Sequence, residues 1–237
     1  MPIPIRERGY PHPELLTETD WLAGRLSDPT VRVVDARSDK DYAHGHIAGA
    51  VHFDGYTLGG LRRGSGMPEP EAFTHLAGAL GIDEHTKVAV YDAGGPPTAG
   101  MVVWAFLYYG HPAACLLDGG LTKWTVEGLP LSNDAPAHEP RAFAARLAEG
   151  VYCSLDQAKT SVDDNGVLIW DVRSIGEFEG TTKGWNALPR LGHLPGAIHL
   201  DWAELFDPDN GTLKPAAELT TLLGAQGITP EATVVTY

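Results

Sequence analysis

This chain of 237 residues contains two cysteines, the residue type whose thiolate can act as a nucleophile. Cys115 lies in the apolar run 113–117, which predicts a buried strand and an inert thiol. Cys153 lies in the opening segment of the second half of the chain. Neither has Cys-x-x-Cys spacing, so a disulfide scaffold is not indicated and a reducing compartment fits. The ten histidines show no metal-ligand spacing, and we expect no metal and no cofactor.

Charged residues follow apolar runs in a pattern that occurs twice. The motif Asp-x-Arg stands at 35–37 and again at 171–173. A Gly-His-x-x-Gly-Ala motif follows each of them, at 45–50 and at 192–197. In both places an acid and a base two positions apart could form an ion pair at the end of a strand.

The spacing of these motifs indicates a duplicated domain. His46 and His193 are 147 positions apart, and Tyr91 and Tyr237, which each close an apolar run, are 146 apart. Solenoid repeats have much shorter periods, so two copies of one domain are the better interpretation.

The elements that must position these motifs alternate along the chain. Apolar runs closed by an acid or a tyrosine predict buried parallel strands, and amphipathic stretches between them predict helices. The expected strands are 31–35, 46–53, 88–91, 114–117, 142–147, 167–171, 197–200 and 233–237. The expected helices are 21–26, 39–45, 69–80, 100–109, one opening at 119, 154–162, 175–178 and 216–223. This order predicts an α/β fold with a mainly parallel sheet in each copy, flanked by helices.

The linker between the copies is expected at 132–139, a stretch rich in Pro, Ala, Asn and Asp. We therefore expect an N-terminal domain over 1–135 and a C-terminal domain over 140–237. Copy one continues for about 40 residues beyond Tyr91, and two copies of one domain should contain the same parts. We accordingly expect the second copy to be incomplete at Tyr237, with its remaining segment supplied, for example, as a separate chain.

The charge balance and the start of the chain exclude several classes of partner. The formal net charge is −14 and no run of Lys or Arg stands out, which argues against nucleic acid and anionic membranes as partners. No apolar run is long enough to span a bilayer, and the first residues lack the apolar core of a signal peptide. We expect a cytoplasmic protein.

The ordered set of motifs resembles the rhodanese domain. Two copies in one chain resemble the tandem-domain thiosulfate or 3-mercaptopyruvate sulfurtransferases. Residues 117–124, with the sequence Leu-Asp-Gly-Gly-Leu-Thr-Lys-Trp, are similar to the non-catalytic N-terminal copy of that family. The resemblance implies two rhodanese-like domains. It also implies an enzyme that moves a sulfane sulfur from thiosulfate or 3-mercaptopyruvate, through a cysteine persulfide, to cyanide or a thiol.

The resemblance places the nucleophile directly after the strand that ends in tyrosine. In copy one this position is Asp92, so we expect copy one to be inactive. In copy two it is the residue after Tyr237, and we expect no catalytic residue within the printed sequence. A loop there, with inward backbone N–H groups and a following helix N-terminus, would lower the thiol pKa and stabilise a persulfide.

The substrate side departs from the family pattern. Arginines usually follow Asp-x-Arg by a few positions, but here Glu177 and Glu179 stand there. Copy two also carries an insertion, because Asp171 and His193 are 22 positions apart where copy one has 11. Residues expected to bind substrate are Arg190, Lys183, Trp185, Trp202 and Glu179, and residues expected to support the site are Asp171, Arg173 and His193. We interpret the Asp-x-Arg arginine as a structural ion-pair residue and the two motif histidines as structural.

Two other functions remain open at this point. One is a non-catalytic rhodanese-homology protein that binds a partner. The other is a phosphatase on the same fold, with a loop one residue longer. A cysteine and a six-residue loop after Tyr237 would indicate sulfur transfer, a longer loop would indicate phosphate, and any other residue would indicate a binding protein.

Overall fold

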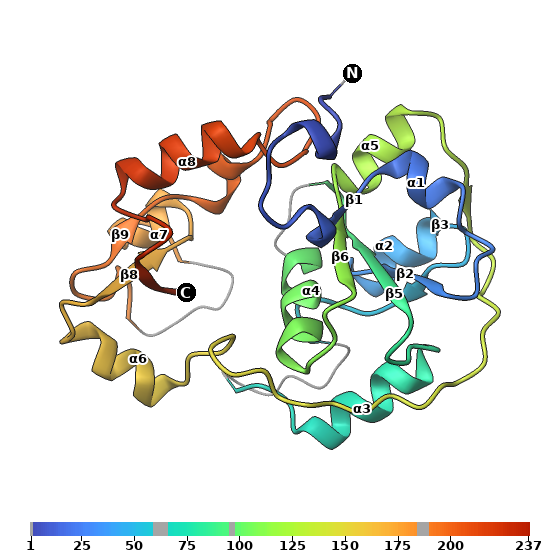
Figure 1. Ribbon diagram of the computed structural model, residues 1–237, viewed down its shortest axis with the longest axis horizontal. Coiled ribbons are helices and arrows are strands. Elements are labelled where there is room, and N and C mark those ends of the chain that lie inside the picture. Colours follow the sequence, from blue (N-terminus) through green and yellow to red (C-terminus); the bar gives the residue numbers. More distant parts are fainter. Residues whose placement is uncertain (1, 59–65, 95–97, 184–189) are drawn as a thin grey trace. The chain divides into compact units, whose positions relative to one another are not determined.

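The computed structural model describes residues 2–58, 66–94, 98–183 and 190–237 (Figure 1). The chain forms two compact units. The first contains residues 1–152 together with 208–213, and the second contains 153–207 and 214–237. In the described part of the chain, no helix has both the length and the apolar character needed to cross a bilayer.

The first unit is built on a five-stranded sheet in the order β1-β6-β5-β2-β4, and every ladder in it is parallel. Its strands are β1 (Leu16–Thr17), β2 (Val31–Asp35), β4 (Val51–His52), β5 (Lys87–Tyr91) and β6 (Ala114–Leu117). A separate antiparallel pair joins β3 (His46–Ile47) to β7 (Leu131–Ser132). The predicted α/β fold with a mainly parallel sheet is therefore confirmed.

Helices cover both faces of this sheet (Figure 1). They are α1 (Thr19–Ala23), α2 (Asp39–His44), α3 (Pro70–Ala79), α4 (Thr98–Tyr108) and α5 (Gly120–Val126), with short 3-10 turns at η1 (Ile5–Glu7) and η2 (Pro13–Leu15). Phe73 of α3 and Phe106 of α4 pack into one core cluster, while Leu22 of α1 and Trp124 of α5 pack into another. Successive residues of a strand point to opposite faces, so alternate residues of β2 and β5 supply the two clusters.

A segment from late in the chain completes the first unit. Asp118 follows β6 and forms a buried ion pair with Arg8, with 2.7 Å between Nη2 and Oδ2. The two side chains hold Leu213 between them. Its amide donates to Oδ1 of Asp118, and its carbonyl accepts from Nη1 of Arg8, at 2.9 Å in each case. Burial raises the pKa of Asp118 despite the charge of Arg8.

The second unit has a three-stranded parallel sheet in the order β10-β8-β9. Its elements are α6 (Leu155–Val162), β8 (Val167–Asp171), α7 (Ile175–Glu179), β9 (Ile198–His199), η3 (Trp202–Leu205), α8 (Ala216–Ala225) and β10 (Thr233–Thr236). Ile169 of the central strand β8 and Leu200 after β9 are buried.

Two predicted strands differ from the structure. The stretch 46–53 forms the separate short strands β3 and β4, because β3 turns away to pair with β7. The stretch 142–147 is not a strand and belongs to the first unit. Backbone amides of Arg141 and Arg146 donate to Gly78 and Tyr109, at the ends of α3 and α4. The alternation of apolar residues there reflects Phe143, which is buried in the core of the first unit.

Candidate active site

The first Asp-x-Arg motif forms a buried frame at the carboxyl end of β2. Arg37 donates through Nε and Nη2 to both carboxylate oxygens of Asp35, at 2.9 and 2.6 Å, and Nη2 also reaches the carbonyl of Gly45. The hydroxyl of Tyr91, at the end of the neighbouring β5, donates to Asp35 at 2.6 Å and accepts from the amide of Ile47. Three chain segments are thus held together by one carboxylate and one phenol.

The second unit contains the same frame. Arg173 donates to both oxygens of Asp171, at 2.9 and 2.6 Å, and to the carbonyl of Gly192. Tyr237 follows β10 and hydrogen-bonds to Asp171. Its hydroxyl accepts from the amide of Leu194 at 2.8 Å. Each contact of the first unit has its equivalent here, although the loop between Asp171 and Gly192 is longer.

Charge and burial act in opposite directions in the second frame. Burial acts to raise the pKa of Asp171, but the hydrogen bonds from Arg173 outweigh it and hold that pKa below its usual value. The hydrogen bond to Asp171 raises the pKa of Arg173, and burial raises the pKa of Tyr237. The frame therefore keeps an ionised acid, a cation and a neutral phenol, which is a structural rather than a proton-transferring combination.

The motif histidines are held by aromatic stacking. His46 stacks on Tyr42 with 4.0 Å between ring centroids, and its Nδ1 lies 3.1 Å from the carbonyl of Tyr42. His193 stacks on Phe178 at 3.8 Å, with Nδ1 2.8 Å from the carbonyl of Phe178. A carbonyl only accepts, so Nδ1 of His193 donates to Phe178. Both ring nitrogens of His46 face carbonyls, because Nε2 also lies 3.0 Å from the carbonyl of Asp134. The two rings fix the entry of the Gly-His motif against the preceding helix.

Asp92 follows Tyr91 and fills a cradle of donors at the start of α4. Its Oδ1 accepts from the amide of Gly94 at 3.0 Å. Its Oδ2 accepts from the amide of Ala99 at 3.0 Å and from the hydroxyl of Thr98 at 3.2 Å. The residue is buried. A negative charge directly after this strand is therefore stabilised by backbone amides and by a helix N-terminus.

Comparison with known proteins decides the family. A model described as Rhodanese-like domain matches residues 18–127 and 154–237, one match for each copy of the frame. The chain belongs to the rhodanese family. Rhodanese relatives include a sulfur carrier protein, TtuD, of Thermus thermophilus, which is 34% identical over 97% of this chain and 84% of its own. A thiosulfate sulfurtransferase of Azotobacter vinelandii is 33% identical over 94% of this chain and 82% of its own.

A solved structure agrees with the sequence comparisons. The 3-mercaptopyruvate sulfotransferase SseA of Escherichia coli has a TM-score of 0.80 and 27% identity, covering 94% of this chain and 87% of that one. Together these relatives show that the predicted tandem rhodanese family is right and that the protein is an enzyme of the sulfurtransferase class.

The two cations that were expected to bind substrate lie on the surface. Lys183 and Arg190 are exposed, and neither forms an ion pair with another residue in the part of the chain that the structure describes. Arg190 is two positions from Gly192, whose carbonyl Arg173 binds. Trp185 lies outside the described residues.

The remaining expected substrate residues lie around the carboxyl end of β8. Trp202 is half-buried, and its amide donates to the carbonyl of Val172 at 2.9 Å. Glu179 is exposed at the end of α7. Glu177 is engaged elsewhere, because its carboxylate accepts from the hydroxyl and amide of Ser174 at the start of that helix. The structure brings Asp171, Arg173 and Tyr237 together, while the His193 ring lies against Phe178. Lys183 and Arg190 stay on the surface.

Neither Cys115 nor Cys153 lies in a cradle of backbone donors like the one around Asp92. Cys115 is fully buried in β6, and burial raises the pKa of its thiol to about 11. Cys153 is half-buried at the start of the second unit, with its Sγ 3.6 Å from the carbonyl of Ser154. Among the described residues, no group of three or more His, Cys, Asp or Glu side chains could hold a metal ion.

Two parts of the frame were not assigned a role from the sequence. One is the tyrosine hydroxyl, which completes the frame in both units. The other is a second histidine, His52 in the first unit and His199 in the second, whose Nε2 lies 2.8 Å from the carbonyl of Arg37 and of Arg173. Both recur at the offset of the repeat, since His52 and His199 are 147 positions apart. This recurrence in the sequence could have indicated that the two residues belong to the frame.

Proposed function

We propose that this sulfurtransferase works through a cysteine persulfide carried by the residue directly after Tyr237. The thiolate attacks the outer sulfur of thiosulfate, the S–S bond breaks, and its electron pair leaves with sulfite. An acceptor such as cyanide then attacks the terminal sulfur of the persulfide. The new carbon–sulfur bond forms thiocyanate, and the thiolate is restored.

The observation that supports this proposal is the environment of Asp92. In the first unit, the residue after the frame tyrosine places a negative charge against the amides of Gly94 and Ala99. The second unit has the same frame up to Tyr237. A thiolate or persulfide at the equivalent place is the anion that such a cradle stabilises, and a carboxylate cannot carry sulfur.

The donor is proposed to be anionic, either thiosulfate or 3-mercaptopyruvate, with a thiol or cyanide as acceptor. Lys183 and Arg190 are exposed and free of ion pairs with described residues, so they can attract a negatively charged donor. Trp202, at the end of β8, and Trp185 are proposed to supply apolar contacts. Glu179 opposes a dianion, which favours the singly charged 3-mercaptopyruvate over thiosulfate.

The test uses the natural full-length protein and mass spectrometry. Incubation with thiosulfate or 3-mercaptopyruvate should add the mass of one sulfur atom to the peptide that begins after Tyr237, and cyanide should remove it with release of thiocyanate. Replacing the residue after Tyr237 with Ser should abolish both steps while leaving the fold intact by circular dichroism. Sulfur found instead on Cys153, or turnover that survives the Ser variant, would contradict the proposal.

A further inference from the structure

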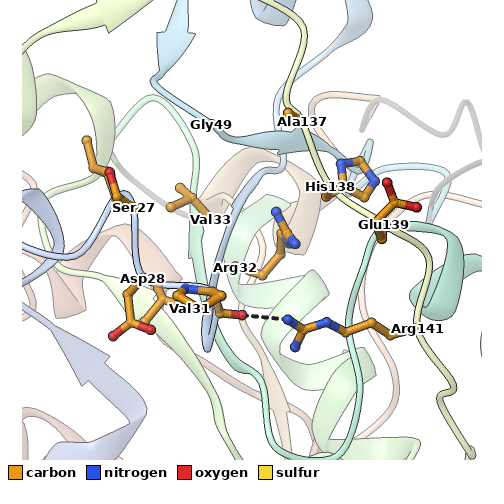
Figure 2. Close-up of a pocket in the computed structure, with 12 residues that line it drawn as sticks. Ser27, Asp28, Val31, Arg32, Val33, Gly49, Ala137, His138, Glu139 and Arg141 are labelled. Atoms are coloured by element: carbon orange, nitrogen blue, oxygen red, sulfur yellow. Dashed lines mark hydrogen bonds between the residues drawn. The ribbon is translucent and has the colours of Figure 1, made fainter.

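A cavity of ≈ 340 Å³ lies in the first unit at the amino end of β2. The turn before β2, the first residues of the strand and the segment 137–141 line it (Figure 2). Because β2 runs from Val31 to Asp35, this end is opposite to the one that carries the Asp35–Arg37 frame. The cavity is therefore separate from the rhodanese motifs and from the position of Asp92.

Arg32 enters this cavity without an anionic partner. Its Nε is buried and has no hydrogen-bond partner. No carboxylate of a described residue lies within ion-pair distance of it. Burial, and secondly the positive charge of Arg141, lower the pKa of Arg32. A partly buried guanidinium that faces another cation and lacks a counter-ion is costly, and a bound anion would remove that cost.

His138 offers a second unsatisfied group to the same space. Its Nε2 lies 3.0 Å from the carbonyl of Ala79, so Nε2 carries the proton and Nδ1 is the acceptor of a neutral ring. Nδ1 is buried and has no partner. A Cβ placed on Gly81 would lie 2.7 Å from Nη2 of Arg32 and 3.1 Å from Cδ2 of His138, so the two side chains are neighbours. Figure 2 shows both facing the same hollow.

We propose that this cavity binds a phosphate group, either inorganic phosphate or the phosphate of a small monoester. The planar guanidinium of Arg32 donates to phosphate oxygens. A phosphate oxygen and Nδ1 of His138 share one proton. Hydrogen phosphate brings this proton, whereas a monoester dianion, whose second pKa is about 6, takes it up from solvent on binding. Sulfate brings no such proton at neutral pH. The cavity is at the small end of ligand pockets, which span roughly 300–1,000 Å³. The apolar Leu26 and Val33 also line it and can contact an organic substituent.

The other charged groups that line the cavity are Arg141, Asp28 and Glu139. Arg141 donates to Asp83 and to the carbonyl of Pro29, so it supplies positive charge rather than a free donor. The carboxylate of Asp28 accepts from the amide and the hydroxyl of Thr30. Glu139 is exposed and lines the cavity, so it opposes an anion. Removing its charge should strengthen binding.

The experiment is a calorimetric titration of the natural full-length protein with inorganic phosphate, with sulfate and with phenyl phosphate, at constant ionic strength. Phosphate should bind with one site per chain and more tightly than sulfate. Arg32→Met should weaken the affinity by about tenfold or more, because a charged hydrogen bond is lost. Glu139→Gln should strengthen it. Arg146→Met, which removes an exposed arginine that does not line the cavity, should leave it unchanged.

The two sources of phosphate are separated by the third ligand. Tighter binding of phenyl phosphate identifies a monoester, and equal or weaker binding identifies inorganic phosphate. Nitrogen NMR on the unmutated protein keeps the test independent of the folding of Arg32→Met, because bound phosphate should shift the Arg32 Nε–H and His138 ring signals saturably. Unshifted signals, or phosphate affinity unchanged in a folded Arg32→Met protein, would overturn the proposal.

Discussion

The hydroxyl of Tyr91 donates a 2.6 Å hydrogen bond to Oδ2 of Asp35, and both residues are completely buried. The same hydroxyl accepts from the amide of Ile47, so it connects β5 to β2 and to the chain entering β3. Burial raises the pKa of Tyr91 far above its usual value, and the neighbouring Asp35 adds to this effect. The phenol therefore stays neutral and acts as both donor and acceptor.

Tyr91→Phe should lower the free energy of unfolding of the first unit by about 1–3 kcal/mol, because a carboxylate oxygen and an amide lose their buried partner. Urea unfolding followed by circular dichroism measures the change. Tyr152→Phe is the matched control, since no hydrogen bond from its hydroxyl to another described residue is found. Equal losses in the two variants would show that the frame hydroxyl contributes nothing specific.

Asp171 should make the second unit sensitive to acid. Its pKa is lower in the folded protein than the usual value of about 4, mainly through Arg173 acting against burial. The folded state therefore gains stability that is complete above about pH 4 and is lost as pH falls through the lower folded pKa. The difference in unfolding free energy between the unmutated protein and Asp171→Asn should shrink over that window. Asp163→Asn, an exposed acid in the same unit, should show no such change.

Much of this fold follows from local pattern in the sequence. The apolar run closed by Asp171 was predicted as the strand 167–171, and β8 has those limits, because the central strand of a parallel sheet carries a nearly unbroken apolar run. The segment 142–147 is also mostly apolar, but backbone amides in and next to it bond to the ends of α3 and α4. Only tertiary structure decides between a strand partner and a helix end.

The site was less predictable than the fold. The Asp-x-Arg ion pair follows from spacing alone, whereas the hydroxyl of Tyr237 reaches Leu194 across 43 positions of sequence. Glu177 was expected near the substrate, but its carboxylate binds Ser174 instead, since a helix start offers unpaired donors to an acid three residues on. The unpaired Arg32 could not be predicted, because the sequence does not show whether an arginine inside a strand has a counter-ion.

Asp92→Ala should leave the turnover of the full-length enzyme within a few-fold while destabilising the first unit. The carboxylate accepts from the buried amide of Ala99 at the start of α4, and leaving a buried donor without its partner costs about 1–3 kcal/mol. Steady-state sulfur transfer and urea unfolding on the same samples separate the two effects. Asp92→Asn should restore part of the stability. A loss of turnover by several orders of magnitude in a folded variant would contradict an inactive first copy.

Arg190→Ala should raise the KM for an anionic sulfur donor and leave kcat nearly unchanged, because the exposed cation attracts the donor before reaction. The increase should be largest at low ionic strength and fade as salt screens the charge. Arg146→Ala, which removes an exposed charge in the first unit, is the control. A KM equal to that of the unmutated enzyme at low salt would exclude Arg190 from the site.

The two printed cysteines should be dispensable for sulfur transfer. Cys115 is fully buried and its thiol has a pKa of about 11, so at neutral pH almost no thiolate is present to attack a donor. Cys153 is half-buried, and the hydrogen bond found for its thiol is to the carbonyl of Ser154, which offers a thiolate no stabilisation. In the full-length protein, the double variant Cys115→Ala and Cys153→Ala should keep turnover within a few-fold. Iodoacetamide should modify Cys153 readily and Cys115 only after unfolding. Loss of turnover and of the persulfide mass in folded Cys153→Ala alone would move the nucleophile to that residue.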